Sequence, residues 1–170
     1  ILCEKPLADT ADEAERLVRE CAAVGALLVV GTNHLFDPAW TRATHHLNAL
    51  DGPISTVTVT LCLSPNDRYH RQVMGEPIAA AAGSARPPLD LDDPVQRASL
   101  VRQLVAGLAV HDLPLVRDLV PDATEVVWAR VVAPVGFDLA LRSDGSLVRF
   151  TAVMLPEGAD TLWRVSVATA

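Results

Sequence analysis

The sequence has few cysteines, and they do not form a recognisable pair. The three, Cys3, Cys21 and Cys62, include no CxxC spacing and leave an odd count. A disulfide framework needs an even set of cysteines, and a structural zinc site needs closely spaced ligands. We therefore expect neither a disulfide-stabilised fold nor a metal centre, and a reducing cytoplasm is the compartment that fits best.

Clustered positive charge and long apolar runs are missing as well. The 170 residues include 14 Lys and Arg against 21 Asp and Glu, a formal net charge of -7. Nucleic acids and anionic membranes are bound through groups of Lys and Arg, so neither partner is predicted. The apolar run 22–30 is broken by Gly25 and is too short to cross a bilayer, and no signal peptide is recognisable. The chain begins at Ile1 rather than Met, so we expect a piece of a longer polypeptide.

The first thirty residues have the pattern of a strand, a helix and a second strand. Thr10 and Glu13 form a capping box, and apolar residues recur at helical spacing over 14–21 until Gly25 ends the helix. Residues 27–30 are a continuous apolar run, which is typical of a parallel strand buried on both faces. This order predicts the C-terminal part of a doubly wound, Rossmann-like α/β domain.

We place the boundary of that domain at residues 1–33 and expect a second, α+β domain over residues 34–170. Its helices should cover 39–50 and the region from Pro94 to 119, with a division near Gly107 and Pro114. Short turns between the later strands predict a largely antiparallel sheet, covered by helices on one face. Residues 64–93 read as a long loop, and loops of that length are commonly functional. The expected strands are 54–63, 125–133, 136–142, 147–155 and 162–168.

The segment Cys3-Glu4-Lys5-Pro6-Leu7-Ala8 holds the first candidate site residue. Lys5 follows a short apolar entry, so it should lie where a strand leaves the sheet, and ligands of open α/β sheets bind beyond the carboxyl ends of the strands. Pro6 biases Lys5 toward an extended backbone, which directs the side chain. A lysine in that place can donate a proton. The plain alternative is a solvated lysine beside Glu4.

Three segments occur in order along the chain: residues 3–6 (Cys-Glu-Lys-Pro), 31–38 (Gly-Thr-Asn-His-Leu-Phe-Asp-Pro) and 111–117 (His-Asp-Leu-Pro-Leu-Val-Arg). Together they resemble the Gfo/Idh/MocA family, which contains glucose-fructose oxidoreductase and inositol dehydrogenase. The resemblance implies an oxidoreductase that uses NAD or NADP. Its substrate would be a CH-OH group of a sugar, cyclitol or related polyhydroxy compound, and it would form a homodimer or homotetramer through the sheet face.

The resemblance also implies roles for single residues. Lys5 and His111 would flank the carbinol carbon, with Lys5 polarising the oxygen. Imidazole, with an ordinary pKa of about 6.5, suits His111 to accept the hydroxyl proton. The residues beside the cofactor would be Glu4, Lys5, Pro6 and Asn33. The candidate substrate contacts are Arg68 and Tyr69 in the long loop, and Asp112.

Two departures from the family pattern leave other interpretations open. No GxGxxG occurs among the nine glycines, so this piece alone should not hold a dinucleotide tightly. Gly107 stands four residues before His111, where active members usually carry an aspartate, and glycine can neither orient nor charge-stabilise an imidazole. A catalytically silent relative that senses a ligand or serves as a structural subunit is one alternative. A module that dimerises through its sheet is another.

The candidate residues have structural interpretations too. A histidine at a helix start is often satisfied by a neighbouring carboxylate, and Asp112 is the nearest in sequence to His111. Asn33 follows a strand, where asparagine is a common turn former. Trp128 and Trp163 lie on expected strands, where we expect them to pack on the sheet or at a subunit contact.

Overall fold

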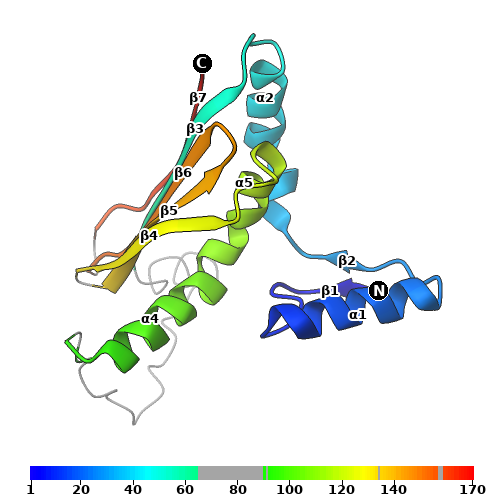
Figure 1. The fold of residues 1–170 in the computed structure, drawn as a ribbon, viewed down its shortest axis with the longest axis horizontal. Helices are drawn as coiled ribbons and strands as arrows, with labels where there is room; N and C mark the ends of the chain where they lie inside the picture. The colour runs from blue at the N-terminus through cyan, green and yellow to red at the C-terminus, as the bar shows by residue number, and fades with distance from the viewer. Residues whose placement is uncertain (65–89, 91, 134, 157–158) are drawn as a thin grey trace, which may run out of the picture.

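The computed structural model describes residues 1–64, 90, 92–133, 135–156 and 159–170. It contains a small strand-helix-strand unit at the N-terminus, followed by a five-stranded sheet with helices packed on one face (Figure 1). The predicted order of a Rossmann-type fragment and an α+β domain is visible in this arrangement. The exact boundary between residues 33 and 34 stays a prediction.

The N-terminal unit forms as the sequence pattern predicts. Thr10 caps the helix by accepting a hydrogen bond from the Glu13 backbone N-H at 3.3 Å. Gly25 follows the helix with a φ of 66°, a left-handed conformation that glycine adopts without a Cβ clash. The two strands pair in parallel, as in a βαβ unit. The elements are β1 (Leu2–Cys3), α1 (Ala11–Ala23) and β2 (Val29–Val30).

The expectation that residues 27–30 form a buried strand is wrong. Only Val29–Val30 is a strand; Leu27 is 77% exposed and Val29 is 41% exposed. The physical reason is the size of the sheet, because β1 and β2 are its only strands within the described residues. Two short strands cannot cover both faces of an apolar run.

The larger sheet has the strand order β4-β5-β6-β3-β7. The pairs β4/β5, β5/β6 and β3/β7 are antiparallel, and β3 pairs in parallel with β6. The predicted largely antiparallel sheet is therefore confirmed, with one parallel pair that arises because β3 inserts between β6 and β7. The strands are β3 (Ile54–Leu63), β4 (Glu125–Val132), β5 (Val135–Ser143), β6 (Ser146–Met154) and β7 (Leu162–Thr169).

The helical layer lies on one face of this sheet (Figure 1). Asp37 and Asp93 cap α2 and α4 by accepting from the backbone N-H groups of Ala39 and Val95. The predicted division near Gly107 is confirmed, because the axis bends by 60° between Pro94–His111 and α5. The elements are the 3₁₀ helix η1 (Asn33–Phe36), α2 (Pro38–Leu47), α4 (Pro94–Gly107), the 3₁₀ helix η2 (Ala109–His111) and α5 (Leu113–Leu119).

The core lies between the helices and the inner face of the sheet. The alternation in β3 predicts this face correctly, because Val57 and Val59 are fully buried. Phe137 and Phe150, from neighbouring strands, stack with ring centroids 5.8 Å apart. Among the described residues, no single helix is long and apolar enough to cross a membrane; only the bent pair of Pro94–His111 and Leu113–Leu119 passes that criterion jointly.

The outer face of the sheet carries a buried carboxylate. Asp138 is 1% exposed and accepts hydrogen bonds from Arg130, Arg149 and Thr151 at 2.9 to 3.3 Å. Burial alone would raise the pKa of Asp138, but these hydrogen bonds, led by that of Arg149, outweigh it and hold the pKa below 3.8. Both guanidinium groups also lie over the ring of Trp128, at 5.6 and 5.9 Å.

Candidate functional site

Two histidines and a tryptophan from three elements meet at one cavity. His34 comes from η1, His111 from the end of η2, and Trp163 from β7. The His34 ring centroid lies 5.3 Å from that of His111 and 4.9 Å from that of Trp163. The cavity has a volume of about 420 Å³, and Leu61 and Leu63 of β3 form its apolar wall.

The buried carboxylate of Asp112 contacts both His34 and Trp163. It is 1% exposed, and its Oδ1 lies 2.9 Å from His34 Nδ1 and 2.7 Å from Trp163 Nε1. The indole N-H can only donate, so Oδ1 acts as an acceptor. One carboxylate oxygen therefore joins residues 51 and 78 positions away in the chain.

Of the two histidines, His111 has the buried ring nitrogen that lacks a hydrogen-bond partner among the described residues. Its Nδ1 is buried and has no hydrogen-bond partner within the described part of the chain. Burial lowers the pKa of His111 below 6.5, and the charges of Lys5 and His34 lower it further, while Asp112 and Glu4 act in the opposite direction. The folded protein thus favours the neutral imidazole at this position.

Lys5 reaches the same region from the N-terminal unit. Its ammonium group donates to the backbone carbonyl of Gly107 at 3.3 Å, four residues before His111. Among the described residues, Lys5 lines a different cavity, of about 730 Å³ between the N-terminal unit and α5, while Gly107 lines the histidine cavity. An ammonium has three hydrogens, so one bond to Gly107 leaves two for a ligand.

The other predicted site residues lie in three places. Glu4 and Pro6 flank Lys5 just after β1, and Asn33 follows β2 as the first residue of η1. Glu4 and Asn33 are exposed. Arg68 and Tyr69 lie outside the described residues. Within the described ranges, no group of three or more His, Cys, Asp or Glu side chains is arranged to hold a metal ion.

The structure corrects two interpretations and adds one residue. The carboxylate of Asp112 binds His34 and Trp163, so it does not satisfy His111. Trp163 does more than pack on the sheet, because its N-H holds Asp112. Sequence reasoning missed His34 as a functional candidate. Its place within the segment 31–38 was the available signal, but its partners are too far away in the chain for any local pattern to reveal them.

The lowered pKa of His111 predicts a pH-dependent stability. We expect the free energy of unfolding to decrease as the pH falls below about 6.5, because the unfolded chain then binds a proton that the folded His111 resists. Above that pH the ring is neutral in both states and contributes nothing. In the variant His111→Gln, denaturant unfolding measured between about pH 7 and pH 5 should show a shallower decrease.

The matched control is His45→Gln, which makes the same chemical change at an exposed position on α2. This control should keep the wild-type pH dependence. An equally steep decrease in His111→Gln and the wild-type protein would contradict the assignment.

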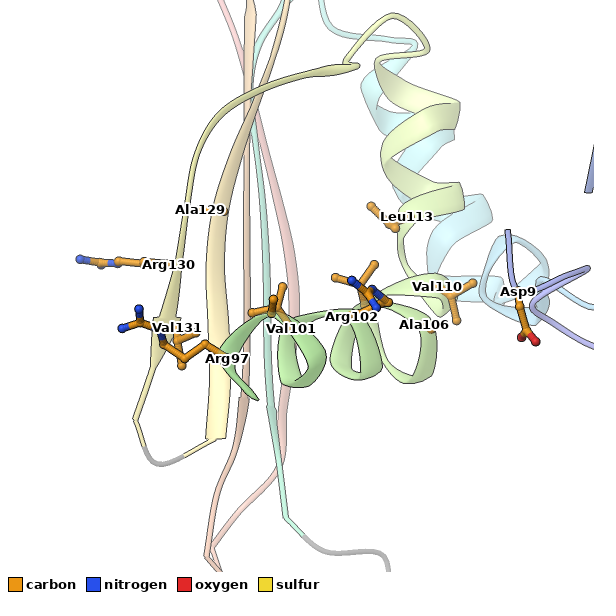
Figure 2. A pocket seen from close by; sticks show the side chains of 12 residues that line it. Asp9, Arg97, Val101, Arg102, Ala106, Val110, Leu113, Ala129, Arg130 and Val131 are labelled. Carbon is orange, nitrogen blue, oxygen red and sulfur yellow. The ribbon is translucent and has the colours of Figure 1, made fainter. Parts of the chain in front are cut away.

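A larger groove of about 960 Å³ lies between α4 and β4, as Figure 2 shows. Its floor is apolar, from Val101, Val105 and Val131. Arg130 lines its rim, but its guanidinium points away from α4 and bonds Asp138 on the outer face of the sheet. The groove brings no acid-base pair together, so we take the smaller histidine cavity as the candidate site.

Comparisons with known proteins identify the fold. No protein-family model matches the sequence, and no curated protein matches it. Among solved structures, the WlbA dehydrogenase from Bordetella pertussis, in complex with NADH and UDP-GlcNAcA, is similar with a TM-score of 0.67 and 18% identity; 99% of this chain and 48% of that chain are covered. The WlbA (WbpB) dehydrogenase from Thermus thermophilus, in complex with NAD and alpha-ketoglutarate, has a TM-score of 0.64 and 18% identity, covering 98% and 49% of the two chains.

A third similar structure is a protein from Sinorhizobium meliloti 1021, provisionally described as a myo-inositol dehydrogenase. It has a TM-score of 0.68 and 18% identity, with 99% of this chain and 47% of that chain covered. The chain thus spans about half the length of the solved structures it matches. The similarity to the Gfo/Idh/MocA dehydrogenases predicted from the sequence is therefore confirmed at the level of the fold.

Proposed function

We propose that this chain is part of an NAD- or NADP-dependent oxidoreductase that acts on a CH-OH group of a sugar, cyclitol or related polyhydroxy compound. The observation that carries the proposal is the approach of Lys5 to the histidine cavity. Its ammonium donates to the carbonyl of Gly107, in the segment that leads to His111. Lys5 lines the neighbouring cavity, and Gly107, which accepts from it, lines the histidine cavity. A cation and imidazole rings are the groups needed to polarise an alcohol oxygen and to accept its proton.

The described residues suit one end of a dinucleotide. Lys5 and Asn33 follow the carboxyl ends of the two parallel strands β1 and β2, where cofactors of α/β sheets bind. The sequence has no glycine-rich turn for a pyrophosphate. Glu4, Lys5, Pro6 and Asn33 would therefore hold the nicotinamide end, and a bound nicotinamide would supply the hydride acceptor.

The nature of the substrate rests on the relatives and on the chemistry of the cavity. Two of the similar dehydrogenases carry UDP-GlcNAcA or alpha-ketoglutarate beside NADH or NAD. Here, the cavity combines polar ring nitrogens of His34 and His111 with an apolar wall. Such a lining suits a small molecule with hydroxyl groups.

A second candidate function has its own supporting observation. Gly107 provides no carboxylate next to His111, and a Cβ added there would contact nothing within 4 Å. Position 107, where active relatives usually carry an aspartate, therefore supplies no carboxylate to the site. A catalytically silent relative that senses a ligand is consistent with this.

Titration of the full-length protein with NADH and NADPH tests the proposal, followed by a screen of polyols at the absorbance of reduced nicotinamide. We expect binding of at least one cofactor and turnover with at least one polyol. Cofactor binding without turnover across a broad panel would favour the sensor. The absence of cofactor binding would leave only a dimerisation module.

We also propose that the outer sheet face joins two copies of the chain. In the described residues this face has no helical cover (Figure 1), and it exposes Trp128, Leu147 and Leu162 at 39%, 44% and 46%. Burial of such exposed apolar side chains between two copies would favour association. Light scattering of the full-length protein should give a dimer or tetramer, and Leu162→Asp should shift it toward the monomer; a monomeric wild-type protein would contradict this.

A further inference from the structure

The Asp112 contacts determine which nitrogen of His34 carries a hydrogen. Trp163 Nε1 donates to Oδ1 of Asp112 at 2.7 Å, and His34 Nδ1 lies 2.9 Å from the same oxygen. An ionised carboxylate has acceptor atoms only, so opposite the carboxylate form of Asp112 the imidazole donates through Nδ1. In a neutral ring, the lone pair is then on Nε2 of His34, which is ready to accept a proton.

The neutral ring of His111 carries its hydrogen on the other nitrogen, Nε2. Its buried Nδ1 has no partner among the described residues, so a hydrogen on that atom would have no acceptor. The neutral ring avoids this cost by carrying its hydrogen on Nε2, as a hydrogen-bond donor. Taking up a second proton would place a hydrogen on Nδ1, and the depressed pKa of His111 agrees with that resistance.

Among the described residues, no other charged group is hydrogen-bonded to His34. Lys5 and Glu4 act on the neighbouring His111, from the N-terminal unit. On α5, which packs against η1, Arg117 and Asp118 are exposed, and Asp118 accepts from the indole of Trp40. Within the part of the chain that the structure describes, Asp112 is therefore the carboxylate that is hydrogen-bonded to the His34 ring.

We propose that His34 is the proton acceptor of this site, with Asp112 as its positioning residue, and that His111 is a neutral hydrogen-bond donor to the substrate oxygen. The inference rests on the proposed function. When an alcohol is oxidised, the O-H bond breaks and its proton passes to Nε2 of His34. The oxygen electron pair forms the second bond of the carbonyl, and the C-H pair leaves as hydride to the oxidised nicotinamide. Asp112 then faces the imidazolium and stabilises its charge.

In this arrangement Asp112 supplies the carboxylate that is missing at position 107. A carboxylate is still present, one residue after His111 rather than four before it, but its hydrogen bond goes to His34. The proton acceptor therefore differs from the one that the family resemblance implies. The three residues that produce the change are His34, Asp112 and Trp163.

The first experiment measures the tautomers directly and does not depend on turnover. In the full-length protein with ¹⁵N-labelled histidine, two-bond ¹H-¹⁵N correlations at mildly alkaline pH should show His34 protonated on Nδ1 and His111 protonated on Nε2. The variants His34→Gln and His111→Gln assign the signals. The opposite tautomer in either ring would overturn the assignment.

The second experiment compares the variants kinetically. His34→Gln removes the acceptor and should lower kcat/KM by about 10²- to 10⁴-fold. His111→Gln keeps an N-H donor and should cost about tenfold, as expected for the loss of one well-placed hydrogen-bond geometry. An equal or larger loss in His111→Gln than in His34→Gln would overturn the proposed roles.

The third experiment separates positioning from simple structural support. Asp112→Asn keeps the size of the side chain but removes its charge, so the acidic limb of the kcat/KM profile should move to lower pH. Trp163→Phe removes one donor to Asp112 without changing that charge, so it should leave the limb in place. If Asp112→Asn lowers kcat/KM equally at every pH, and the acidic limb of the pH profile does not move, the role of Asp112 is contradicted. Correct tautomers without turnover of any polyol would overturn the proposed function, and the proton transfer with it.

Discussion

Lys5→Ala should lower kcat/KM of the full-length protein by about 10²- to 10⁴-fold, the range for loss of a group that assists proton transfer. Lys5 is a half-buried residue, and its ammonium donates to the carbonyl of Gly107 at 3.3 Å in an exposed hydrogen bond. This bond positions the ammonium beside the segment that leads to His111. Alanine cannot polarise the substrate oxygen or stabilise negative charge that develops on it.

Cofactor affinity separates this role from a general loss of structure. The affinity for NADH or NADPH, measured by fluorescence titration, should change little in Lys5→Ala, because most of a dinucleotide is held through its phosphates and adenosine. Arg19→Ala is a matched control: it removes a cation from the same N-terminal unit, where Arg19 forms an exposed ion pair with Glu15. Unchanged turnover in Lys5→Ala, or an equal loss in Arg19→Ala, would contradict a catalytic role for Lys5.

The largest effect on stability is expected for Phe150→Ala, which should lower the free energy of unfolding by about 3–5 kcal/mol. Phe150 is fully buried on the inner face of β6 and stacks on Phe137 at 5.8 Å. Removing the ring loses the transfer free energy of an aromatic side chain and leaves a cavity that a central strand, paired on both sides, cannot collapse to fill.

Denaturant unfolding followed by tryptophan fluorescence measures this change, because Trp128 and Trp163 both lie on strands of the sheet. Ser166→Ala is the matched control in β7. Its side chain is exposed, so the substitution should change the free energy by no more than about 0.5 kcal/mol. A loss below about 1 kcal/mol in Phe150→Ala would show that the core is not organised around this aromatic pair.

Local patterns account for most of the elements. The ten residues of β3 were predicted with their bounds, since strict alternation with Val57 and Val59 on one side has only one reading. The start of α4 at Pro94 and its division near Gly107 follow from proline and glycine, whose backbone preferences are intrinsic. The burial of residues 27–30 was not predictable in the same way, because burial depends on how many strands flank the run.

In the candidate site, too, residues in local motifs could be predicted, and contacts between distant segments could not. Lys5 and His111 were predicted as candidates because they lie in short segments that resemble known motifs, within which neighbours in sequence are neighbours in space. The two hydrogen-bond partners of Asp112 were not predicted, because His34 and Trp163 are 78 and 51 residues away in the chain and lie on different elements. No spacing rule relates residues at such separations.

By itself, the sequence determined most of the strands, the helices with their caps, the negative net charge and the choice of Lys5 and His111 as candidates. Only the tertiary structure decided that β3 enters the sheet between β6 and β7, and that one buried oxygen of Asp112 holds both His34 and Trp163. The physical reason is the distance along the chain over which each effect acts. Dihedral preferences and side-chain periodicity act over a few residues. Strand order and hydrogen bonds between elements depend instead on how the whole apolar surface is buried at once.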